Sequence, residues 1–501
     1  MKQKSWLKFW NSDDDEGLPT RQVRLLVIGA GDAAASIIRE IQGDTRSRFE
    51  VVVCVDDDHH KHGQTLLEVP VRGPISKLLY FVSRFQADEI LIAMPSVTGN
   101  DMRQVVCACK SSGLPFKTLP SLSSLVDGKV TVSAVRDVEY EDILGRPAVT
   151  MDFAGIGRCL TGKTVAVTGA GGSIGSELCR QIIRFKPASI VLIEANEFNL
   201  YQIERELRSE LLFETVYPAM GRVQDRALMA SLFDKYRPQV VFHAAACKHV
   251  PMVEMNPWEG VTNNTVGSAV LMDVAEEYGV ERFVQVSTDK AVRPTSVMGT
   301  TKRVAEIFLQ SRLPGKTRFM AVRFGNVLGS SGSVIPLFQR QICEGGPVTV
   351  THPDMTRYFM MIPEACQLIL QAGAMGEGGE IFILEMGTPV RIDDMARDMI
   401  RLCGKVPDQD IQIVYTGLRP GEKLYEELIT HGEGIVRTAH DKIMVLKRDD
   451  KNMNPADLDQ RIREQVEAVQ AVAHSFDAER LKSALKEVVP EYTPDGSDPA
   501  P

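Results

Sequence analysis

The sequence lacks long apolar runs, paired cysteine motifs and an excess of positive charge, and each absence excludes a class of protein. No apolar run approaches the roughly 20 residues that a helix needs to cross a bilayer. The nine cysteines are scattered without a C-x-x-C pair, and no signal peptide is recognisable, a pattern typical of the reducing cytosol. With 57 Lys and Arg against 66 Asp and Glu, the net charge is −9, which argues against general nucleic-acid binding. We therefore expect a cytoplasmic protein that binds neither nucleic acid nor a metal ion.

The N-terminal segment, residues 1–20, is the one stretch that suggests a membrane. Between Lys2 and Trp10, lysines alternate with tryptophan, leucine and phenylalanine, a pattern that suits an anionic lipid surface. The stretch is too short to anchor the protein by itself. We interpret it as a flexible leader whose contact with a membrane is at most peripheral.

The chain of 501 residues is too long for one ordinary domain, and residues 21–150 have the pattern of a Rossmann-like unit. An apolar strand at 23–28 leads into Gly-Ala-Gly-Asp-Ala-Ala at 29–34, a partial Gly-x-Gly-x-x-Ala fingerprint before a helical pattern. A second strand ends in three acids at 56–58. The fingerprint fits a Rossmann-like fold with or without a bound nucleotide, so the ligand of this unit stays open. The pattern loosens over residues 126–158, which we interpret as a connector between two units.

Residues 151–450 predict a second unit of the same α/β class. Its apolar strands, KTVAVT, ASIVLIE, PQVVFH, ERFVQV and TRFMAVR, alternate with helical patterns. This alternation predicts a doubly wound parallel sheet, in which ligands bind beyond the carboxyl ends of the strands. We thus expect two Rossmann-like parallel-sheet units, the second with a smaller C-terminal substrate-binding part. Residues 451–501 are interpreted as a polar helical tail with a disordered end.

A glycine-rich turn after the first strand of the second unit predicts a dinucleotide site. Gly169, Gly172 and Gly175 stand between strand and helix, where glycines let backbone N–H groups approach a diphosphate. Glu194 ends the next strand, where a carboxylate can accept hydrogen bonds from the adenosine ribose and repel a 2′-phosphate. The expected cofactor is therefore NAD rather than NADP. The expected cofactor contacts are Gly169, Gly172, Ser173, Ile174, Gly175, Glu194, Asp225, Ala245 and Lys302.

Two further stretches carry reactive side chains. Ser-Thr-Asp-Lys at 287–290 follows the strand FVQV, and Met-Gly-Thr-Thr-Lys at 298–302 opens the next helix. Residues four apart share one face of a helix, so Met298 and Lys302 lie on the same side. The spacing resembles the Tyr-x-x-x-Lys of short-chain dehydrogenases, with Met298 where the tyrosine would stand. Lys302 could then hold the nicotinamide ribose, as the lysine of that family does.

Together these stretches resemble the UDP-N-acetylglucosamine 4,6-dehydratases of the extended short-chain dehydrogenase/reductase superfamily, in their larger polysaccharide-biosynthesis form. The resemblance covers residues 23–447 and rests on TGAGGSIGSEL, EFNLYQIE, HAAACKHVP, STDKAVRPTSVMGTTKR, RFGNVLGSSGSVIPLF, TRYFMMIPEA and GLRPGEKLYEEL. Members of the larger form usually carry four membrane-spanning helices ahead of the first Rossmann-like unit. This chain has none, so it resembles the soluble portion alone.

The resemblance implies a cycle in which bound NAD takes a hydride from C4 of the sugar and returns it to C6 after water is lost. The product is UDP-2-acetamido-2,6-dideoxy-4-hexulose. Asp289 is expected to protonate the leaving 6-hydroxyl, if burial raises its pKa. Lys290 is expected to remove the C5 proton, if its pKa falls from about 10.4 towards neutrality. Thr288 can hydrogen-bond the C4 oxygen. The thioether of Met298 cannot accept the C4 hydroxyl proton, which leaves Lys302, directly or through water, or Thr288 as a relay.

Polar residues after other strands are expected around the UDP-sugar. The candidates are Lys248, His249, Asn263, Arg323, Asn326, Arg357, Arg419 and Glu422. The resemblance puts Asn326 against the UDP moiety. Arg357, and Arg419 with Glu422, look like diphosphate and ribose contacts, because the planar fork of arginine gives two parallel charged hydrogen bonds.

Two other functions stay open. A sugar-nucleotide C4 epimerase shares the cofactor, the fold and the C4 oxidation but needs no acid at C6, so Asp289 with Lys290 favours the dehydratase. A non-catalytic NAD-binding scaffold of a glycan assembly complex is marked by loss of the Thr-Asp-Lys run, which this chain keeps. The sequence does not distinguish GlcNAc from GalNAc or the product's stereochemistry at C5. We also expect a homo-oligomer.

Overall fold

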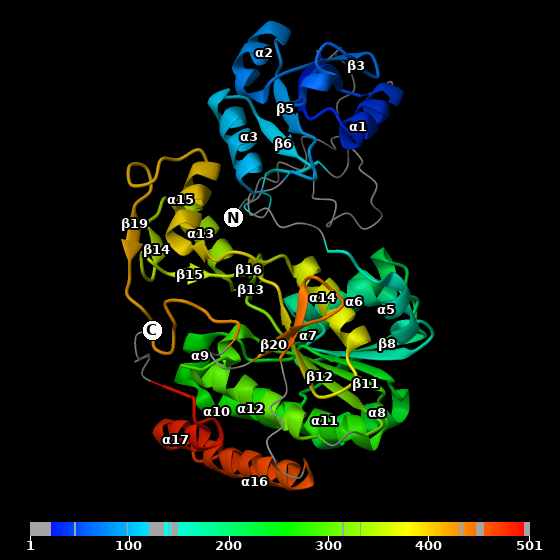
Figure 1. Ribbon diagram of the computed structural model, residues 1–501, viewed down its shortest axis with the longest axis vertical. Coiled ribbons are helices and arrows are strands. Elements are labelled where there is room, and N and C mark those ends of the chain that lie inside the picture. Colours follow the sequence, from blue (N-terminus) through cyan, green and yellow to red (C-terminus); the bar gives the residue numbers. More distant parts are fainter. Residues whose placement is uncertain are drawn as a thin grey trace. The chain divides into compact units, whose positions relative to one another are not determined.

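The structure is a computed structural model that describes residues 22–44, 47–97, 99–119, 135–138, 140, 142, 149–312, 315–330, 332–429, 434–446 and 455–494. The expected leader and most of the expected connector lie outside these residues. The chain forms two compact units, Met1–Pro147 and Ala148–Pro501, both traced in Figure 1.

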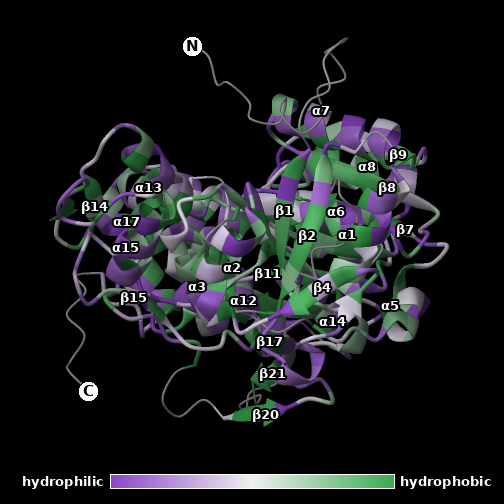
Figure 2. Ribbon diagram, turned by 90° about the horizontal axis from the view of Figure 1, so that it is seen from above, coloured by the Kyte–Doolittle hydropathy of each residue, from purple (hydrophilic) through white to green (hydrophobic). Residues whose placement is uncertain are grey.

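The first unit is built on one sheet with the strand order β3-β4-β2-β1-β5-β6. The strands are β1 (Val23–Ile28), β2 (Phe49–Val55), β3 (Thr65–Leu66), β4 (Val69–Arg72), β5 (Glu89–Ile92) and β6 (Phe116–Thr118), and the helices are α1 (Asp32–Gly43), α2 (Leu78–Phe85) and α3 (Gly99–Ser111). All pairings except β3 with β4 are parallel. The central strands β1 and β2 are largely hydrophobic (Figure 2), as expected for a parallel sheet covered on both faces. The predicted Rossmann-like fold is confirmed.

The second unit contains a nine-stranded sheet with the order β20-β21-β17-β12-β11-β10-β7-β8-β9. Its strands are β7 (Thr164–Thr168), β8 (Ser189–Glu194), β9 (Val216–Met220), β10 (Val240–His243), β11 (Arg282–Val286), β12 (Arg318–Arg323), β17 (Glu380–Leu384), β20 (Ile435–Arg437) and β21 (Ile443–Leu446). Neighbouring strands pair in parallel across the sheet through β17, β12, β11, β10, β7, β8 and β9. The strands β21 and β20 add an antiparallel edge beside β17. The predicted doubly wound parallel sheet is confirmed.

Helices bury both faces of this sheet. They are α5 (Phe153–Leu160), α6 (Ser173–Ile183), α7 (Glu197–Arg205), α8 (Arg226–Tyr236), α9 (Val250–Met255), α10 (Pro257–Gly260), α11 (Gly267–Glu277), α12 (Val297–Ser311) and α14 (Ile362–Met375). Neighbouring strand residues enter opposite cores: Val241 and Phe283 pack against α11 and α12, while Phe242 and Val284 pack on the side of α6 and α14. This two-sided burial explains why the strand sequences are continuously apolar.

Two helices near the C-terminus, α16 (Pro455–Ala473) and α17 (Ala478–Val488), belong to the second unit. Ile462, Val466 and Leu481 are buried in the same core as α11 and α12. The helical character expected for residues 451–501 is present, but the segment from 455 to 494 packs into the core of the second unit and is not a separate tail.

A smaller part of the second unit is formed by residues between β12 and β17 and by residues that follow β17. It consists of three two-stranded sheets, β13 (Asn326–Val327) with β16 (Phe359–Met360), β14 (Val348–Val350) with β19 (Ile413–Tyr415), and β15 (Thr356–Arg357) with β18 (Val390–Arg391). The helices α13 (Val334–Cys343) and α15 (Ile392–Leu402) accompany them. This part brings Asn326 and Arg357 to the cleft described below.

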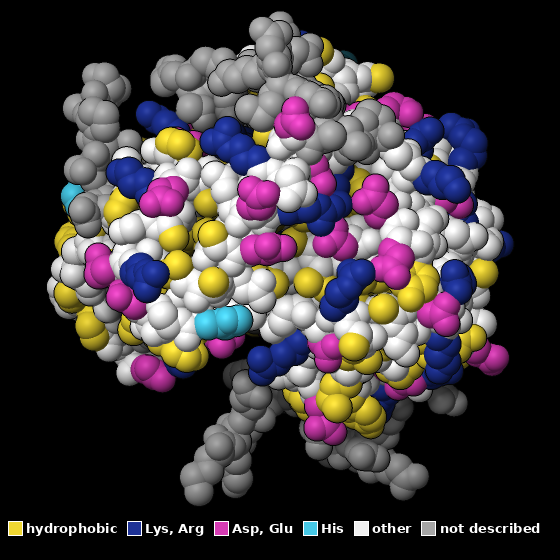
Figure 3. Space-filling model, turned by 90° about the horizontal axis from the view of Figure 1, so that it is seen from below, with side chains coloured by type: hydrophobic (Ala, Val, Ile, Leu, Met, Phe, Trp, Pro, Cys, Tyr) yellow, Lys and Arg dark blue, Asp and Glu magenta, His cyan; other side chains and the backbone are white. Residues whose placement is uncertain are grey.

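The surface seen in Figure 3 mixes Lys and Arg with Asp and Glu side chains instead of gathering one sign of charge. Among the described helices, none has both the length and the apolar character that a membrane crossing requires.

Candidate active site

A cleft of about 900 Å³ in the second unit contains most of the residues singled out from the sequence. Its lining includes Gly172, Ser173, Ile174, Gly175, Lys248, His249, Thr288, Asp289, Lys290, Met298, Lys302, Asn326, Arg357, Arg419, Glu422 and Glu426. The lining residues that follow β7, β10, β11 and β12 lie at one edge of the parallel sheet, where ligands bind in doubly wound folds. Arg357, Arg419, Glu422 and Glu426 come from the smaller part of the unit.

The glycine-rich turn between β7 and α6 leaves no room for a side chain at Gly169 or at Gly175. Gly169 has a positive φ of +63°, and a Cβ on it would lie 2.7 Å from the backbone nitrogen of Ala245. A Cβ on Gly175 would lie 2.0 Å from the carbonyl oxygen of Gly169. Gly172 stands at the N-cap of α6 and brings no capping side chain. The first turn of α6, residues 173–175, lines the cleft, where the N-terminus of a helix suits an anionic group.

The acid at the end of β8 contacts this turn directly. The carboxylate of Glu194 accepts hydrogen bonds from the backbone N–H of Gly171 at 3.0 Å and of Asn196 at 2.9 Å. Asp225 caps α8 by accepting from the N–H of Leu228 at 3.0 Å. Like Gly169, Glu194 and Ala245, it is not among the residues that line the cleft. Gly169 and Ala245 shape the turn from behind. The contact with Gly171 places Glu194 beside the glycine-rich turn, as a dinucleotide site requires. Asp225 instead stabilises the first turn of α8.

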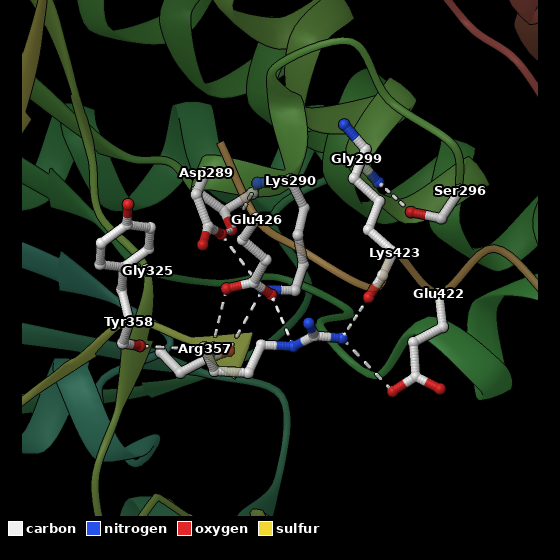
Figure 4. A network of polar contacts seen from close by, with 12 residues as sticks. Asp289, Lys290, Ser296, Gly299, Gly325, Arg357, Tyr358, Glu422, Lys423 and Glu426 are labelled. Carbon is white, nitrogen blue, oxygen red and sulfur yellow. Dashed lines mark hydrogen bonds and ion pairs between the residues drawn. The ribbon is translucent and has the colours of Figure 1, made fainter. Parts of the chain in front are cut away.

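The reactive side chains after β11 form a compact group that we call the acid–base cluster, made of Asp289, Lys290, Arg357 and Glu426 (Figure 4). The Nζ atom of Lys290 lies 3.1 Å from Oδ1 of Asp289 and 2.5 Å from Oε1 of Glu426. The Nε atom of Arg357 lies 3.1 Å from the same Oε1 atom. Thr288 caps the short helix η8 (Asp289–Ala291) and donates its hydroxyl to Oδ1 of Asp289 at 2.9 Å.

The charges in the acid–base cluster shift the pKa values against the sequence-based expectation. Burial acts to raise the pKa of Asp289, but the Lys290 ammonium and hydrogen bonds from Glu426 and Thr288 outweigh it and lower the pKa. Burial acts to lower the pKa of Lys290, yet Asp289 and Glu426 raise it overall. Glu426 is the group near neutrality, because burial and the Asp289 carboxylate raise its pKa to about 7. The sequence-based expectation of a raised pKa for Asp289 and a lowered pKa for Lys290 is therefore wrong in both directions.

The helix α12 places Met298 and Lys302 on the wall of the cleft, as the four-residue spacing predicts. Ser296 caps the helix by accepting from the N–H of Gly299 at 3.2 Å. The Nζ atom of Lys302 donates to the carbonyl of Val286 at 3.0 Å. Burial lowers the pKa of Lys302 to about 8, so this amine can lose its proton close to neutrality.

Two of the expected substrate residues lie outside the cleft lining. Arg323 is fully buried and pairs with Glu306 of α12, its Nη2 atom 2.7 Å from Oε2. Asn263 donates to the side-chain oxygen of Asn264 at 3.0 Å. Asn264 in turn binds both the N–H and the carbonyl of Cys247, at 2.8 and 2.9 Å. The structure therefore gives Arg323 a packing role and makes Asn263 a neighbour of the residue that fixes the loop after β10.

Arg357 lines the cleft, but its guanidinium is bound by residues 423–426 of the same chain. It donates to the carbonyl oxygens of Lys423 at 2.8 Å and Leu424 at 3.2 Å, besides pairing with Glu426. Arg357 thus fixes the segment that carries Glu426, whereas Arg419 and Lys248 lie on the cleft wall. Sequence reasoning missed Glu426 altogether.

Comparison with known proteins gives two family matches. A model described as "Polysaccharide biosynthesis protein" matches residues 165–448, and one described as "CoA-binding domain" matches residues 16–120. The capsular polysaccharide biosynthesis protein CapD of Staphylococcus aureus is 46% identical over 422 residues, covering 83% of this chain and 70% of CapD.

Two shorter relatives are enzymes by name. A UDP-N-acetylglucosamine 4,6-dehydratase (inverting) of Campylobacter jejuni is 32% identical over 275 residues, 54% of this chain and 78% of the relative. A UDP-glucose 4-epimerase of Rickettsia massiliae is 30% identical over 279 residues, 54% of this chain and 79% of the relative. The crystal structure of Pen from Bacillus thuringiensis is 31% identical with a TM-score of 0.53, covering 61% of this chain and 98% of Pen. Because one family model spans more than half of the chain and CapD matches most of both proteins, the chain belongs to the polysaccharide biosynthesis protein family, with nucleotide-sugar dehydratases and epimerases among its relatives.

Proposed function

We propose that the protein is a nucleotide-sugar 4,6-dehydratase that converts UDP-N-acetylglucosamine to UDP-2-acetamido-2,6-dideoxy-4-hexulose for surface polysaccharide or glycan biosynthesis. The observation that carries this proposal is the pair of Asp289 and Lys290 in the same cleft as the glycine-rich turn and Lys302. Oxidation at C4 needs only a hydride acceptor and a base, whereas loss of water also needs an acid at C6 and a base at C5. The identity of 32% to the Campylobacter jejuni dehydratase supports the same function.

The cofactor that fits the turn best is NAD. When bound, NAD supplies the acceptor for the C4 hydride and returns that hydride to C6. The N-terminal N–H groups of α6 suit its diphosphate, and Glu194 is adjacent to them through its bond to Gly171. A carboxylate at this place favours ribose hydroxyls and disfavours a 2′-phosphate. Lys302 and Ile174 line the cleft beyond the turn.

Lys302 is the base that we assign to the C4 hydroxyl. Its pKa of about 8 leaves about a tenth of the amine neutral at pH 7, and this fraction grows as pH rises. Met298 has no group that accepts a proton, and the hydroxyl of Thr288 donates to Asp289 at 2.9 Å in this state. Thr288 can still turn to hydrogen-bond the C4 oxygen, but the proton has its best acceptor in Lys302.

Asp289 and Lys290 suit the elimination because C5 and C6 are adjacent atoms. The C5–H bond breaks and its proton goes to the amine of Lys290, while the C6–O bond breaks and the hydroxyl leaves as water with the proton of Asp289. The distance of 3.1 Å between Nζ of Lys290 and Oδ1 of Asp289 lets one acid and one base serve neighbouring carbons. The 4-ketone makes the C5 proton acidic enough for an amine to remove.

A UDP-sugar C4 epimerase is the second candidate, and the identity of 30% to the Rickettsia massiliae enzyme supports it. It would use the same oxidation and would leave Asp289 and Lys290 without a proton-transfer task. The deciding experiment incubates the purified protein with UDP-N-acetylglucosamine and identifies the products by mass spectrometry and NMR. A product lighter by one water, with a methyl group at C6, is the expected result. A C4 epimer of unchanged mass would overturn the proposal in favour of the epimerase.

A further inference from the structure

Glu426 is one of four carboxyl groups that line the cleft, with Asp289, Glu422 and Glu427, and the proposed reaction gives it no task. Its side chain is buried, and Oε1 lies 2.5 Å from Nζ of Lys290 and 3.1 Å from Nε of Arg357. Its other oxygen accepts from the side-chain amide of Asn326 at 3.1 Å. Asp289 contacts the same Nζ atom of Lys290 through Oδ1 at 3.1 Å, so the two carboxyl groups share one ammonium group. Figure 4 shows the carboxyl groups of Asp289 and Glu426 turned towards one another.

Two ionised carboxylates that contact one ammonium group repel each other, and because a carboxylate only accepts hydrogen bonds they cannot bond to one another. Two carboxylates that share a site cannot both ionise readily, so one proton is retained between them. The charged groups that face Glu426 are Asp289 and Lys290 from η8 and Arg357 from β15; Glu422, Lys423 and Glu427 lie on its own segment. Glu427 is engaged by Lys423 and by Arg293, so it does not take the place of Glu426.

We propose that Asp289 and Glu426 hold one proton between them, and that Glu426 is the positioning residue that keeps Asp289 able to protonate the leaving 6-hydroxyl. This inference rests on the proposed 4,6-dehydration for its purpose, but the shared proton itself does not. Arg357 and Asn326 orient the Glu426 carboxyl so that it contacts both Asp289 and Lys290.

The pKa directions agree with this geometry. Burial and the adjacent Asp289 raise the pKa of Glu426 to about 7, while the pKa of Asp289 is lowered. The shared proton therefore resides mainly on Glu426 at rest, and Asp289 alone would be ionised. Asp289 has a lowered pKa and yet must act as an acid. The proton held on the neighbouring Glu426 resolves this conflict, because it can pass to Asp289 when the hydroxyl leaves.

The proton count of the three groups allows acid and base to be ready together. At rest Lys290 is an ammonium ion, and the two carboxyl groups share one proton. Transfer of a proton from Nζ of Lys290 to Oε1 of Glu426 across 2.5 Å leaves a neutral amine and two protonated carboxyl groups. Asp289 then gives its proton to the departing hydroxyl, and the neutral Lys290 accepts the C5 proton. When the hydride returns to C6, Lys290 gives the proton back to C5. The cluster is then one proton short, and the proton that the C4 hydroxyl released earlier restores the resting state.

The test compares the parent protein with Glu426→Gln, with Glu426→Asp as the conservative variant. Glu364→Gln is the matched control, since Glu364 is a buried glutamate paired with Lys442 at 3.1 Å outside the cleft. Single-turnover decay of the reduced cofactor measures the elimination as a function of pH. In the parent this rate should fall as pH rises through about 7, because the acid must be protonated. In Glu426→Gln the amide donates to Asp289 and keeps it ionised, so the fall should move to lower pH and the rate above neutrality should drop roughly tenfold or more.

Infrared difference spectroscopy provides a readout without substrate. The parent should show the carbonyl stretch of a protonated carboxyl that disappears on raising the pH, and both Glu426→Gln and Asp289→Asn should change it, whereas Glu364→Gln should not. If Glu426→Gln keeps the parent pH profile, or if the parent shows no such band, the inference is wrong. If the band is present but the parent yields no dehydrated sugar, the proposed function fails while the shared proton stands. Should Glu426→Gln not fold, the band of the parent and the pH profile of Glu426→Asp decide in its place.

Discussion

Arg323 and Glu306 form a fully buried ion pair, with Nη2 of Arg323 lying 2.7 Å from Oε2 of Glu306. Arg323 ends β12 and Glu306 belongs to α12. The second oxygen of the carboxylate accepts from Nε of Arg323 at 2.8 Å and from the hydroxyl of Ser287 at 2.7 Å. One carboxylate therefore joins two strand ends to the helix of Lys302. This joint fixes the run from Thr288 to Lys290 relative to Lys302.

Replacing Arg323 by methionine should destabilise the second unit without abolishing UDP binding by the folded fraction. Removal of one partner leaves a buried charge uncompensated, which typically costs about 3–5 kcal/mol. Urea unfolding followed through the fluorescence of Trp258, which packs in the same unit, measures the loss. The double variant Arg323→Met with Glu306→Leu should recover part of the stability. Loss of UDP affinity at unchanged stability would instead restore the substrate-binding role that the sequence suggested.

The sequence was sufficient for features that depend on local pattern. The apolar strands, the glycine turn and the acid at the end of β8 each carry a short-range signal, and all appear where the pattern indicates. The role of Arg323 had no such signal, because its partner Glu306 lies 17 positions away on another element. An arginine at the carboxyl end of a strand is equally suited to a phosphate and to a buried carboxylate, and only the packing distinguishes the two.

Glu426 was missed for a related reason. The motif GLRPGEKLYEEL contains adjacent glutamates, and neither periodicity nor spacing tells which of them contacts Lys290 in an irregular segment. The structure turns Glu426 inwards to Lys290 and Glu427 towards Arg293. The helices after residue 455 offered a clearer signal: Ile462, Val466 and Val469 are spaced as an apolar stripe, although the polar composition of the segment obscured it.

NAD should bind far more tightly than NADP, and Glu194→Ala should narrow that difference. The carboxylate accepts from ribose hydroxyls and repels a 2′-phosphate, and alanine does neither. Isothermal titration with both cofactors gives the two affinities for parent and variant. Asp225→Ala is the comparison, because Asp225 caps α8 through Leu228; its loss should lower stability and leave the ratio of affinities unchanged. Equal affinities in the parent would contradict the assignment of NAD.

Asp289→Asn and Lys290→Met should oxidise the sugar but stop before water loss. Asparagine has no proton to give to the leaving hydroxyl, and methionine cannot accept the C5 proton. Removal of a positioned acid or base typically costs on the order of 10²–10⁴ in rate, so reduced cofactor should accumulate after UDP-N-acetylglucosamine is added. Its absorbance, together with the absence of dehydrated product, is the measurement. Normal turnover by both variants would show that the two roles are wrongly assigned.

The oxidation step should depend on the protonation of Lys302. Burial lowers the pKa of this amine to about 8, and only the neutral amine can accept the C4 hydroxyl proton, so the oxidation rate should rise as pH increases through that value. The Asp289→Asn background isolates this step, because its only signal is the reduced cofactor that it accumulates.

Adding Lys302→Arg to Asp289→Asn separates binding from proton transfer at this position. Arginine keeps the positive charge for the ribose but does not lose a proton in the accessible pH range, so NAD affinity should be largely retained while reduced cofactor no longer forms. Lys302→Met should lose both properties. Lys235→Met, a substitution on the outer helix α8 where the lysine lies over Tyr236, should leave both unchanged. If the arginine variant still oxidises the sugar at the parent rate, the proton goes instead to Thr288 or to water, and the rise with pH must have another source.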